Sequence, residues 1–82
     1  MKFALLTPAR NVAELTATYI RIPGEAGEFG VLPGHMPLVS TLRAGGVVEV
    51  TDEAGEKSQF KVTGGFADVR TDGVTVLAES LE

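Results

Sequence analysis

Turn-forming residues recur along the whole chain at intervals of about 8 to 12 positions, and this spacing constrains the fold more than any other feature. Ten glycines and four prolines are spread over 82 residues. The segments between them are long enough for strands but short for helices. The sequence therefore predicts an all-β fold with seven or eight strands and no helix longer than one turn.

Alternating side chains identify the first hairpin. In the strand Lys57 to Val62, alternate residues point to one face: Ser58, Phe60 and Val62. A strand over Gly46 to Thr51 precedes it, and the acidic loop 52–56 joins the two. We expect Phe60 to be buried, because its face of the strand is directed at the core.

A second hairpin is predicted from Phe66 to Arg70 and from Val74 to Ala78. The connecting Thr71-Asp72-Gly73 contains an Asp-Gly pair, which accepts the positive φ angles of tight hairpin turns. This is the strongest short-range signal in the chain.

Three further strands complete the prediction. Phe3 and Leu5 belong to one, and Thr18, Ile20 and Ile22 to another that we expect to pair with it antiparallel. Leu38 to Leu42 adds a short strand. Short connections favour antiparallel pairing, so we predict a two-sheet antiparallel β-sandwich that forms one domain over residues 1–82.

Composition excludes several classes of protein. The net charge is −4 and basic residues are not clustered, so nucleic acid is not an expected partner. Apolar stretches are shorter than the roughly 18 to 20 residues of a membrane-spanning helix, so we expect no direct membrane insertion. Cysteine is absent, so neither disulfides nor thiolate metal sites can support so small a core. A protein partner is the expected supplement.

The sequence contains no pattern that predicts a catalytic, cofactor-binding or metal site. His35, the only histidine, has no triad or metal-ligand set at a suitable spacing, so we assign it a structural or interface role. The glycine-rich segment 24–30 lacks the Gly-Lys-Ser/Thr ending of a phosphate loop. The acidic residues of loop 52–56 lack the ligand order of a calcium loop.

One segment is unusually apolar for a loop. It runs from Phe29 to Leu38 and includes Pro33 and Pro37. A soluble monomer seldom exposes so much apolar surface without a partner. The segment therefore either folds inward or forms an interface, and the residues alone leave both readings open.

The same segment carries a family signature. Gly27-Glu28-Phe29-Gly30-Val31-Leu32-Pro33-Gly34-His35-Met36-Pro37-Leu38 resembles the signature of ATP synthase epsilon subunits, which are equivalent to the mitochondrial delta subunit. Similarity continues through residues 42–45, 62–66 and 74–78, and so covers nearly the whole chain in family order.

The resemblance implies a rotor subunit without catalytic activity of its own. Such a sandwich, of about ten strands in the family, docks on the gamma subunit and rests on the polar loops of the membrane c-ring. It couples proton-driven rotation to ATP synthesis, peripherally, at the cytoplasmic face of the bacterial inner membrane. Carried over by position, the c-ring contacts are Glu25, Glu28 and Phe29, and the gamma contacts are His35, Met36, Pro37 and Leu38. We expect the Glu28 carboxylate to accept bonds from a basic side chain of the ring.

The end of the chain limits what the resemblance implies. Family members usually continue into a two-helix domain that regulates ATP hydrolysis, whereas this chain stops at Glu82. We therefore expect no C-terminal helical hairpin and no inhibitory or ATP-sensing role. The alternative function is a stand-alone β-sandwich that binds a small ligand or carbohydrate, but the chain has no Trp and only Tyr19 as a tyrosine.

Overall fold

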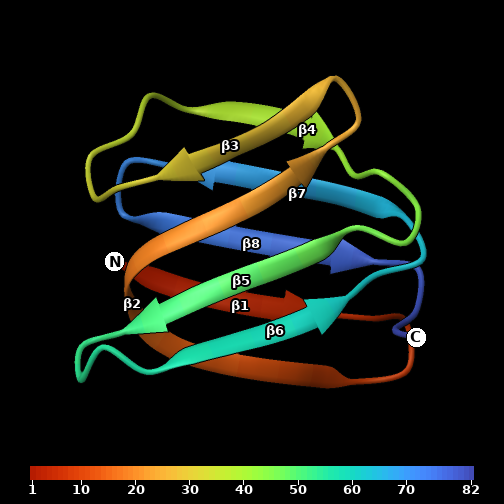
Figure 1. Cartoon of the computed structure of the whole chain (residues 1–82), viewed down its shortest axis with the longest axis horizontal. Coiled ribbons are helices and arrows are strands. Elements are labelled where there is room, and N and C mark those ends of the chain that lie inside the picture. Colours follow the sequence, from red (N-terminus) through yellow and green to blue (C-terminus); the bar gives the residue numbers. More distant parts are fainter.

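The computed structural model describes residues 1–82 and contains eight β-strands and no helix (Figure 1). The strands are β1 (Lys2–Leu6), β2 (Asn11–Gly24), β3 (Gly27–Val31), β4 (Leu38–Thr41), β5 (Val47–Asp52), β6 (Lys57–Lys61), β7 (Gly65–Arg70) and β8 (Gly73–Ala78). No helix of the length and apolarity that a bilayer crossing requires is present. The predicted number of strands is confirmed.

Strand β2 builds both layers of the fold. Its first part pairs with β1 in sheet A, whose strand order is β4-β7-β8-β1-β2. Its second part pairs with β3 and β5 in sheet B, whose order is β3-β2-β5-β6. In Figure 1 the strands of sheet B pass obliquely over those of sheet A. The predicted two-sheet sandwich is confirmed, and β2 joins its sheets into one continuous ladder.

The antiparallel prediction has one exception. Both predicted hairpins, β5 with β6 and β7 with β8, are present and antiparallel. Strands β1 and β8 instead run parallel, with Lys2 opposite Gly73 and Leu6 opposite Leu77. These strands come from the two ends of the chain, so no short loop has to join them and the antiparallel constraint of a hairpin does not apply.

A β-bulge in β2 turns Thr18 away from the core. The pairing register shifts between Ala17 and Tyr19, so Thr18 is an extra residue that lies exposed, while Ala17 and Ile20 are both buried. The Thr18 hydroxyl donates to the carbonyl of Thr51 at 3.3 Å. Before the bulge, β2 pairs with β1 through the segment Asn11 to Thr16, and not through the predicted segment around Ile20.

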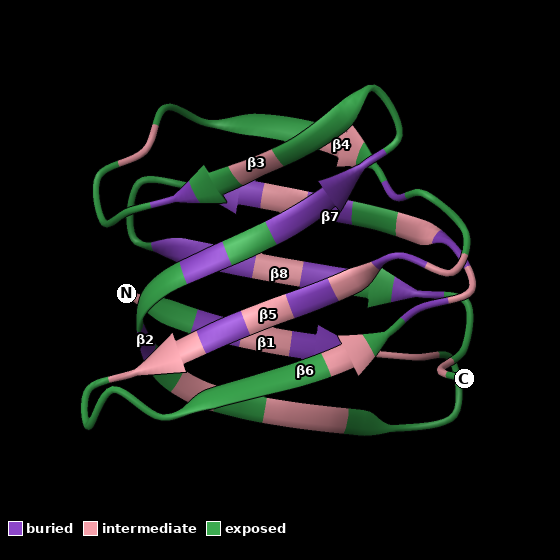
Figure 2. Cartoon of the chain, viewed as in Figure 1, coloured by how far each residue is buried: buried purple, intermediate pink, exposed green.

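The core between the sheets is wholly apolar. Figure 2 shows its buried residues in purple on strands of both sheets. Its buried residues are Phe3, Leu5, Ala17, Ile20, Ile22, Val31, Leu42, Val48, Val50, Val62, Ala67, Val69, Val74, Val76 and Ala78. Val62 is fully buried as predicted, but Phe60 is only partly buried. Phe60 lies on β6, at the edge of sheet B, where one side has no neighbouring strand to cover it.

The β7–β8 turn forms where predicted but for a different reason. Gly73 does not have a positive φ angle, and it is the first residue of β8. A Cβ atom at this position would collide with the carbonyl oxygen of Lys2 on β1. Glycine is needed here because two backbones approach closely, and the predicted need for a positive φ angle is wrong.

Candidate docking site

The residues assigned to the c-ring lie on the β2–β3 hairpin. Glu25 is in its turn, between the paired residues Gly24 and Gly27, and its backbone N–H donates to the carbonyl of Thr41 at 2.8 Å. Glu28 and Phe29 follow in β3. Because Phe29 is opposite the buried Ile22, it faces the core, whereas Glu28 faces outward. The structure therefore does not bring all three side chains to one surface.

Glu28 is the centre of an ion cluster. Its Oε1 atom accepts bonds from Arg21, at 2.8 Å from Nη2 and 3.3 Å from Nε. Its Oε2 atom accepts a 3.4 Å bond from Nη2 of Arg43. Arg21, first through its hydrogen bonds and then through its charge, holds the pKa of Glu28 below its ordinary value of 4.5, and Arg43 adds a smaller effect in the same direction.

Local backbone structure positions both arginines. Arg21 on β2 is opposite Gly30 and hence diagonal to Glu28, a distance that long side chains bridge. Arg43 follows β4, where its N–H donates to the carbonyl of Pro23 at 2.9 Å. A turn then returns the chain, with Gly46 N–H bonded to the carbonyl of Arg43 at 3.0 Å and Gly45 at a φ of 77°.

Sequence reasoning missed these arginines and left Glu28 as a free acceptor. In the structure the carboxylate already accepts bonds from two guanidinium groups. The diagonal spacing of Arg21 and Glu28 across a predicted hairpin was an available signal. Nothing in the sequence indicated Arg43, which is 15 residues away from Glu28.

The residues assigned to the gamma subunit lie at the opposite end of β3. The loop from Leu32 to Pro37 is tied to the β7–β8 turn, since Gly34 N–H donates to the carbonyl of Thr71 at 3.0 Å. The Nδ1 atom of His35 lies 2.7 Å from the carbonyl oxygen of Met36. The rings of His35 and Phe29 are 6.4 Å apart. His35 is thus held by local contacts.

One part of the apolar segment folds inward and another part is exposed. Val31 is fully buried and Phe29 packs against the core. Leu32 and Met36 are exposed, Met36 to 78%. Val39, the second residue of β4, is 70% exposed. The segment therefore anchors itself in the core through β3 and presents apolar side chains beyond it.

A second apolar surface lies on the outer face of sheet A, which we name the sheet A face. Phe66 on β7 is directly opposite Leu77 on β8, and Leu77 is opposite Leu6 on β1. Phe66 and Leu77 are exposed, and Leu6 is partly exposed. Together with Val39 these residues form the sheet A face. Phe66 and Leu77 were predicted only as strand residues, and their outward alternation was the signal for this face.

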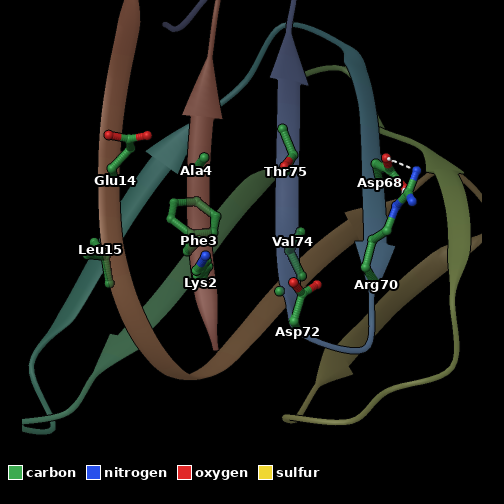
Figure 3. A pocket seen from close by; sticks show the side chains of 11 residues that line it. Lys2, Phe3, Ala4, Glu14, Leu15, Asp68, Arg70, Asp72, Val74 and Thr75 are labelled. Atoms are coloured by element: carbon green, nitrogen blue, oxygen red, sulfur yellow. Dashed lines mark hydrogen bonds and ion pairs between the residues drawn. The ribbon is translucent and has the colours of Figure 1, made fainter.

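A hollow of about 670 Å³ lies over strands β1, β2, β7 and β8 (Figure 3). Small residues line part of it, among them Ala4, Gly73 and Thr75, with charged residues from both ends of the chain around them: Lys2, Glu14, Asp68, Arg70 and Asp72. Arg70 is paired with Asp68 at 3.2 Å.

The geometry agrees with one family of proteins. Over residues 1–82 the sequence matches the family described as "ATP synthase, Delta/Epsilon chain, beta-sandwich domain". The chain belongs to this family. Among sequence relatives of this delta/epsilon sandwich, the "ATP synthase epsilon chain" of Jannaschia sp. (strain CCS1) is 46% identical over 79 residues, or 96% of this chain and 58% of the relative.

Two solved structures contain chains with a similar fold. A chain in the Euglena gracilis mitochondrial ATP synthase, a structure with OSCP, F1 and c-ring, aligns with a TM-score of 0.83 and 33% identity, over 98% of this chain and 51% of that one. A chain from the central stalk and c-ring of the Tetrahymena thermophila mitochondrial ATP synthase, 17% identical, shares the fold with a TM-score of 0.79 over 100% of this chain and 65% of its own length. In the sequence comparison, the present chain spans little more than half the length of the Jannaschia relative.

The outer face of sheet B in this delta/epsilon sandwich is polar by contrast. Arg21 is opposite Glu49, and Glu49 accepts a 2.8 Å bond from Gln59 and lies 4.0 Å from Lys57. The hydrogen-bonding groups of Glu49 and Gln59 are thus paired with each other, and Lys57 balances the charge of Glu49. The two outer faces therefore differ: that of sheet B is covered by paired polar groups, whereas sheet A carries the apolar row beside charged residues such as Asp68 and Arg70.

Proposed function

We propose that the chain is a non-catalytic part of the rotating central stalk of an ATP synthase. In this role it contacts the gamma subunit and the c-ring, and it helps proton-driven rotation of the ring to reach the sites of ATP synthesis. Support comes from the family match over residues 1–82 and from the likeness to a chain within a complex of F1 and c-ring. The complex would place the domain peripherally at the cytoplasmic face of the bacterial inner membrane.

The observation that carries the proposal is the apolar sheet A face on so small a domain. Phe66 and Leu77 expose apolar area opposite each other, and Val39 is exposed on the same sheet opposite Asp68, whereas the outer face of sheet B carries paired charges. Apolar side chains grouped on one face and rimmed by polar residues are typical of protein interfaces. We assign this face, with Leu38 and the loop of His35, Met36 and Pro37, to the gamma subunit.

The positions of the two assigned contact sets suit a domain wedged between two partners. The Glu25 turn is tied to Thr41 at one end of β3, and the His35 loop is tied to Thr71 at the other end. We assign the first end to the c-ring. A domain with a single apolar core between two bonded sheets deforms little, so force applied at one end would reach the other.

A capture experiment tests this function. The chain, tagged at its C-terminus, is incubated with solubilised membranes, and the gamma and c subunits are sought by mass spectrometry. Recovery of both subunits is expected. A monomer that captures neither would contradict the proposal and favour the ligand-binding alternative. That alternative has little support in the aromatic residues, because Tyr19 lies against Gly30 instead of forming an open ring platform.

A further inference from the structure

Of the strands at the edges of the two sheets, only β4 carries no charged residue. Strand β4 and the first part of β2 are the edges of sheet A, and β3 and β6 are those of sheet B. Charged side chains on an edge hinder its unpaired backbone groups from pairing with another chain. The first part of β2 carries Glu14, β3 carries Glu28, and β6 carries Lys57 and Lys61. Strand β4, at the top of Figure 1, reads Leu-Val-Ser-Thr and lacks this protection.

Alternate backbone groups of β4 point away from its neighbour β7. Next to β4, the N–H of Leu42 donates to the carbonyl of Gly65, the first residue of β7, at 2.9 Å. The Thr41 carbonyl instead accepts from Glu25, on the other side, at 2.8 Å. Because backbone groups alternate in direction along a strand, those of Val39 point to the same side as those of Thr41. No further strand pairs with this side, so the N–H and C=O of Val39 and the N–H of Thr41 have no partner strand.

Space for another segment lies beside this edge. A hollow of about 490 Å³ is lined by Glu25, Ala26, Val39, Ser40 and Thr41. The bond from Glu25 closes the edge at the Thr41 carbonyl, and Pro37, which has no N–H, precedes β4 at its other end. A segment that pairs with the free groups would therefore be short.

We propose that β4 pairs through this free edge with an extended segment of the gamma subunit. The inference rests on the proposed function, which assigns to gamma both the loop before β4 and the sheet A face. Val39 belongs to that face and is 70% exposed, so the free edge continues the same surface. The gamma residue opposite Val39 should be apolar, because the two side chains would lie side by side. Its neighbours along the segment should be small enough for the hollow.

Amide hydrogen exchange, followed by NMR with and without the purified gamma subunit, tests the pairing in the wild-type chain. The amides of Val39 and Thr41 should exchange rapidly in the free chain and at least about tenfold more slowly in the complex. The amide of Gln59 on β6 is the control. It points away from β5, as does the carbonyl of Lys61, which accepts from Glu82, and its exchange should not change.

Three variants separate pairing of the backbone from contact of the side chain. Val39→Pro removes the outward N–H but keeps an apolar side chain, so it should weaken gamma binding about tenfold or more. Proline is tolerated on an edge strand where its nitrogen faces outward, so the variant should fold. Val39→Ala keeps the N–H and should weaken binding only about threefold. Lys57→Pro, at the first residue of β6, is the matched control and should leave the affinity unchanged.

The outcomes separate this inference from the function on which it rests. A wild-type chain that does not bind gamma overturns both. Binding that leaves the amides of Val39 and Thr41 unprotected overturns the inference alone, and so does a folded Val39→Pro that binds no worse than Val39→Ala. The exchange measurement decides even if Val39→Pro does not fold. A free chain that is dimeric, with these amides already protected, would assign the edge to a second copy and overturn the inference.

Discussion

The rings of Phe3 and Phe60 stack across the sandwich, with centroids 6.2 Å apart and planes 24° from parallel. Phe3 is fully buried on β1 at the centre of sheet A, and Phe60 covers it from the edge strand β6. The pair therefore joins the two sheets, but its members are unequally covered.

This inequality predicts unequal losses of stability. Phe3→Ala should lower the free energy of unfolding by about 3 to 5 kcal/mol, as expected for a large core truncation. Phe60→Ala should cost less, about 1 to 3 kcal/mol, because part of the ring is already in water. Urea denaturation of both variants measures the difference. An equal or greater loss for Phe60→Ala would contradict the partial burial of that ring.

The ion cluster predicts a specific titration. The pKa of Glu28 lies below 4.5, mainly because of Arg21. R21Q should raise this pKa more than R43Q does, since the hydrogen bonds of Arg21 have the larger effect. The side-chain carboxyl shift of Glu28, followed by NMR as a function of pH, measures both. A larger change in R43Q would reverse the assigned order.

The same shift has a consequence for acid stability. A carboxyl group whose pKa is lower in the folded state stabilises that state above its unfolded pKa, and the contribution disappears as the pH falls through the folded value. For Glu28 this window begins near pH 4.5 and extends below it. E28Q should therefore show a weaker loss of stability over that acid range than the wild type. Thermal unfolding of both proteins at a series of pH values makes the comparison. If the stabilities of E28Q and the wild type fell in parallel with pH, the predicted contribution of Glu28 would be excluded.

Close backbone approach predicts the effect of one glycine substitution. Gly73→Ala would place a methyl group against the Lys2 carbonyl, where neither strand can move freely, and should cost about 1 to 3 kcal/mol. Gly30→Ala is the matched control, because its methyl group would meet the side chain of Tyr19, which can rotate away. The denaturant midpoints of the two variants measure the two losses of stability. If Gly30→Ala lost as much stability as Gly73→Ala, the backbone contact at Gly73 would not be the cause of the larger loss.

The sheet A face predicts separable effects on binding and folding. Phe66→Ser and Val39→Ser remove exposed apolar groups, so each should change the stability of the isolated chain by about 1 kcal/mol or less. Each should nevertheless reduce capture of the gamma subunit. Thr51→Ser, on the outer face of sheet B, should leave capture unchanged. Undiminished capture by both sheet A variants would exclude this face as the gamma contact.

Much of the fold follows from local patterns. Alternation identified Val62 as an inward residue, and turn residues located both hairpins. Such patterns are reliable because successive side chains of a strand point to opposite faces whatever the strand packs against. The bulge at Thr18 escaped this reasoning, since an extra residue reverses the alternation without leaving a mark in composition.

The candidate site could be predicted only in part. The apolar segment from Phe29 to Leu38 was recognisable from its residues, and its exposed members include Leu32 and Met36. The ion cluster was not recognisable, because Arg43 reaches Glu28 only after β4 has returned beside the β2–β3 hairpin.

The recurring turns and alternating residues thus determined, by themselves, that this protein is an all-β sandwich with Val62 facing its core. Only the tertiary structure decided that β1 and β8 run parallel, that Phe66, Leu77 and Leu6 form one outer row, and that Glu28 is held by two arginines. The facing of a side chain is a property of its own strand, whereas the choice of neighbouring strands depends on burying the whole core at once. Contacts between distant residues therefore become visible only in the folded chain.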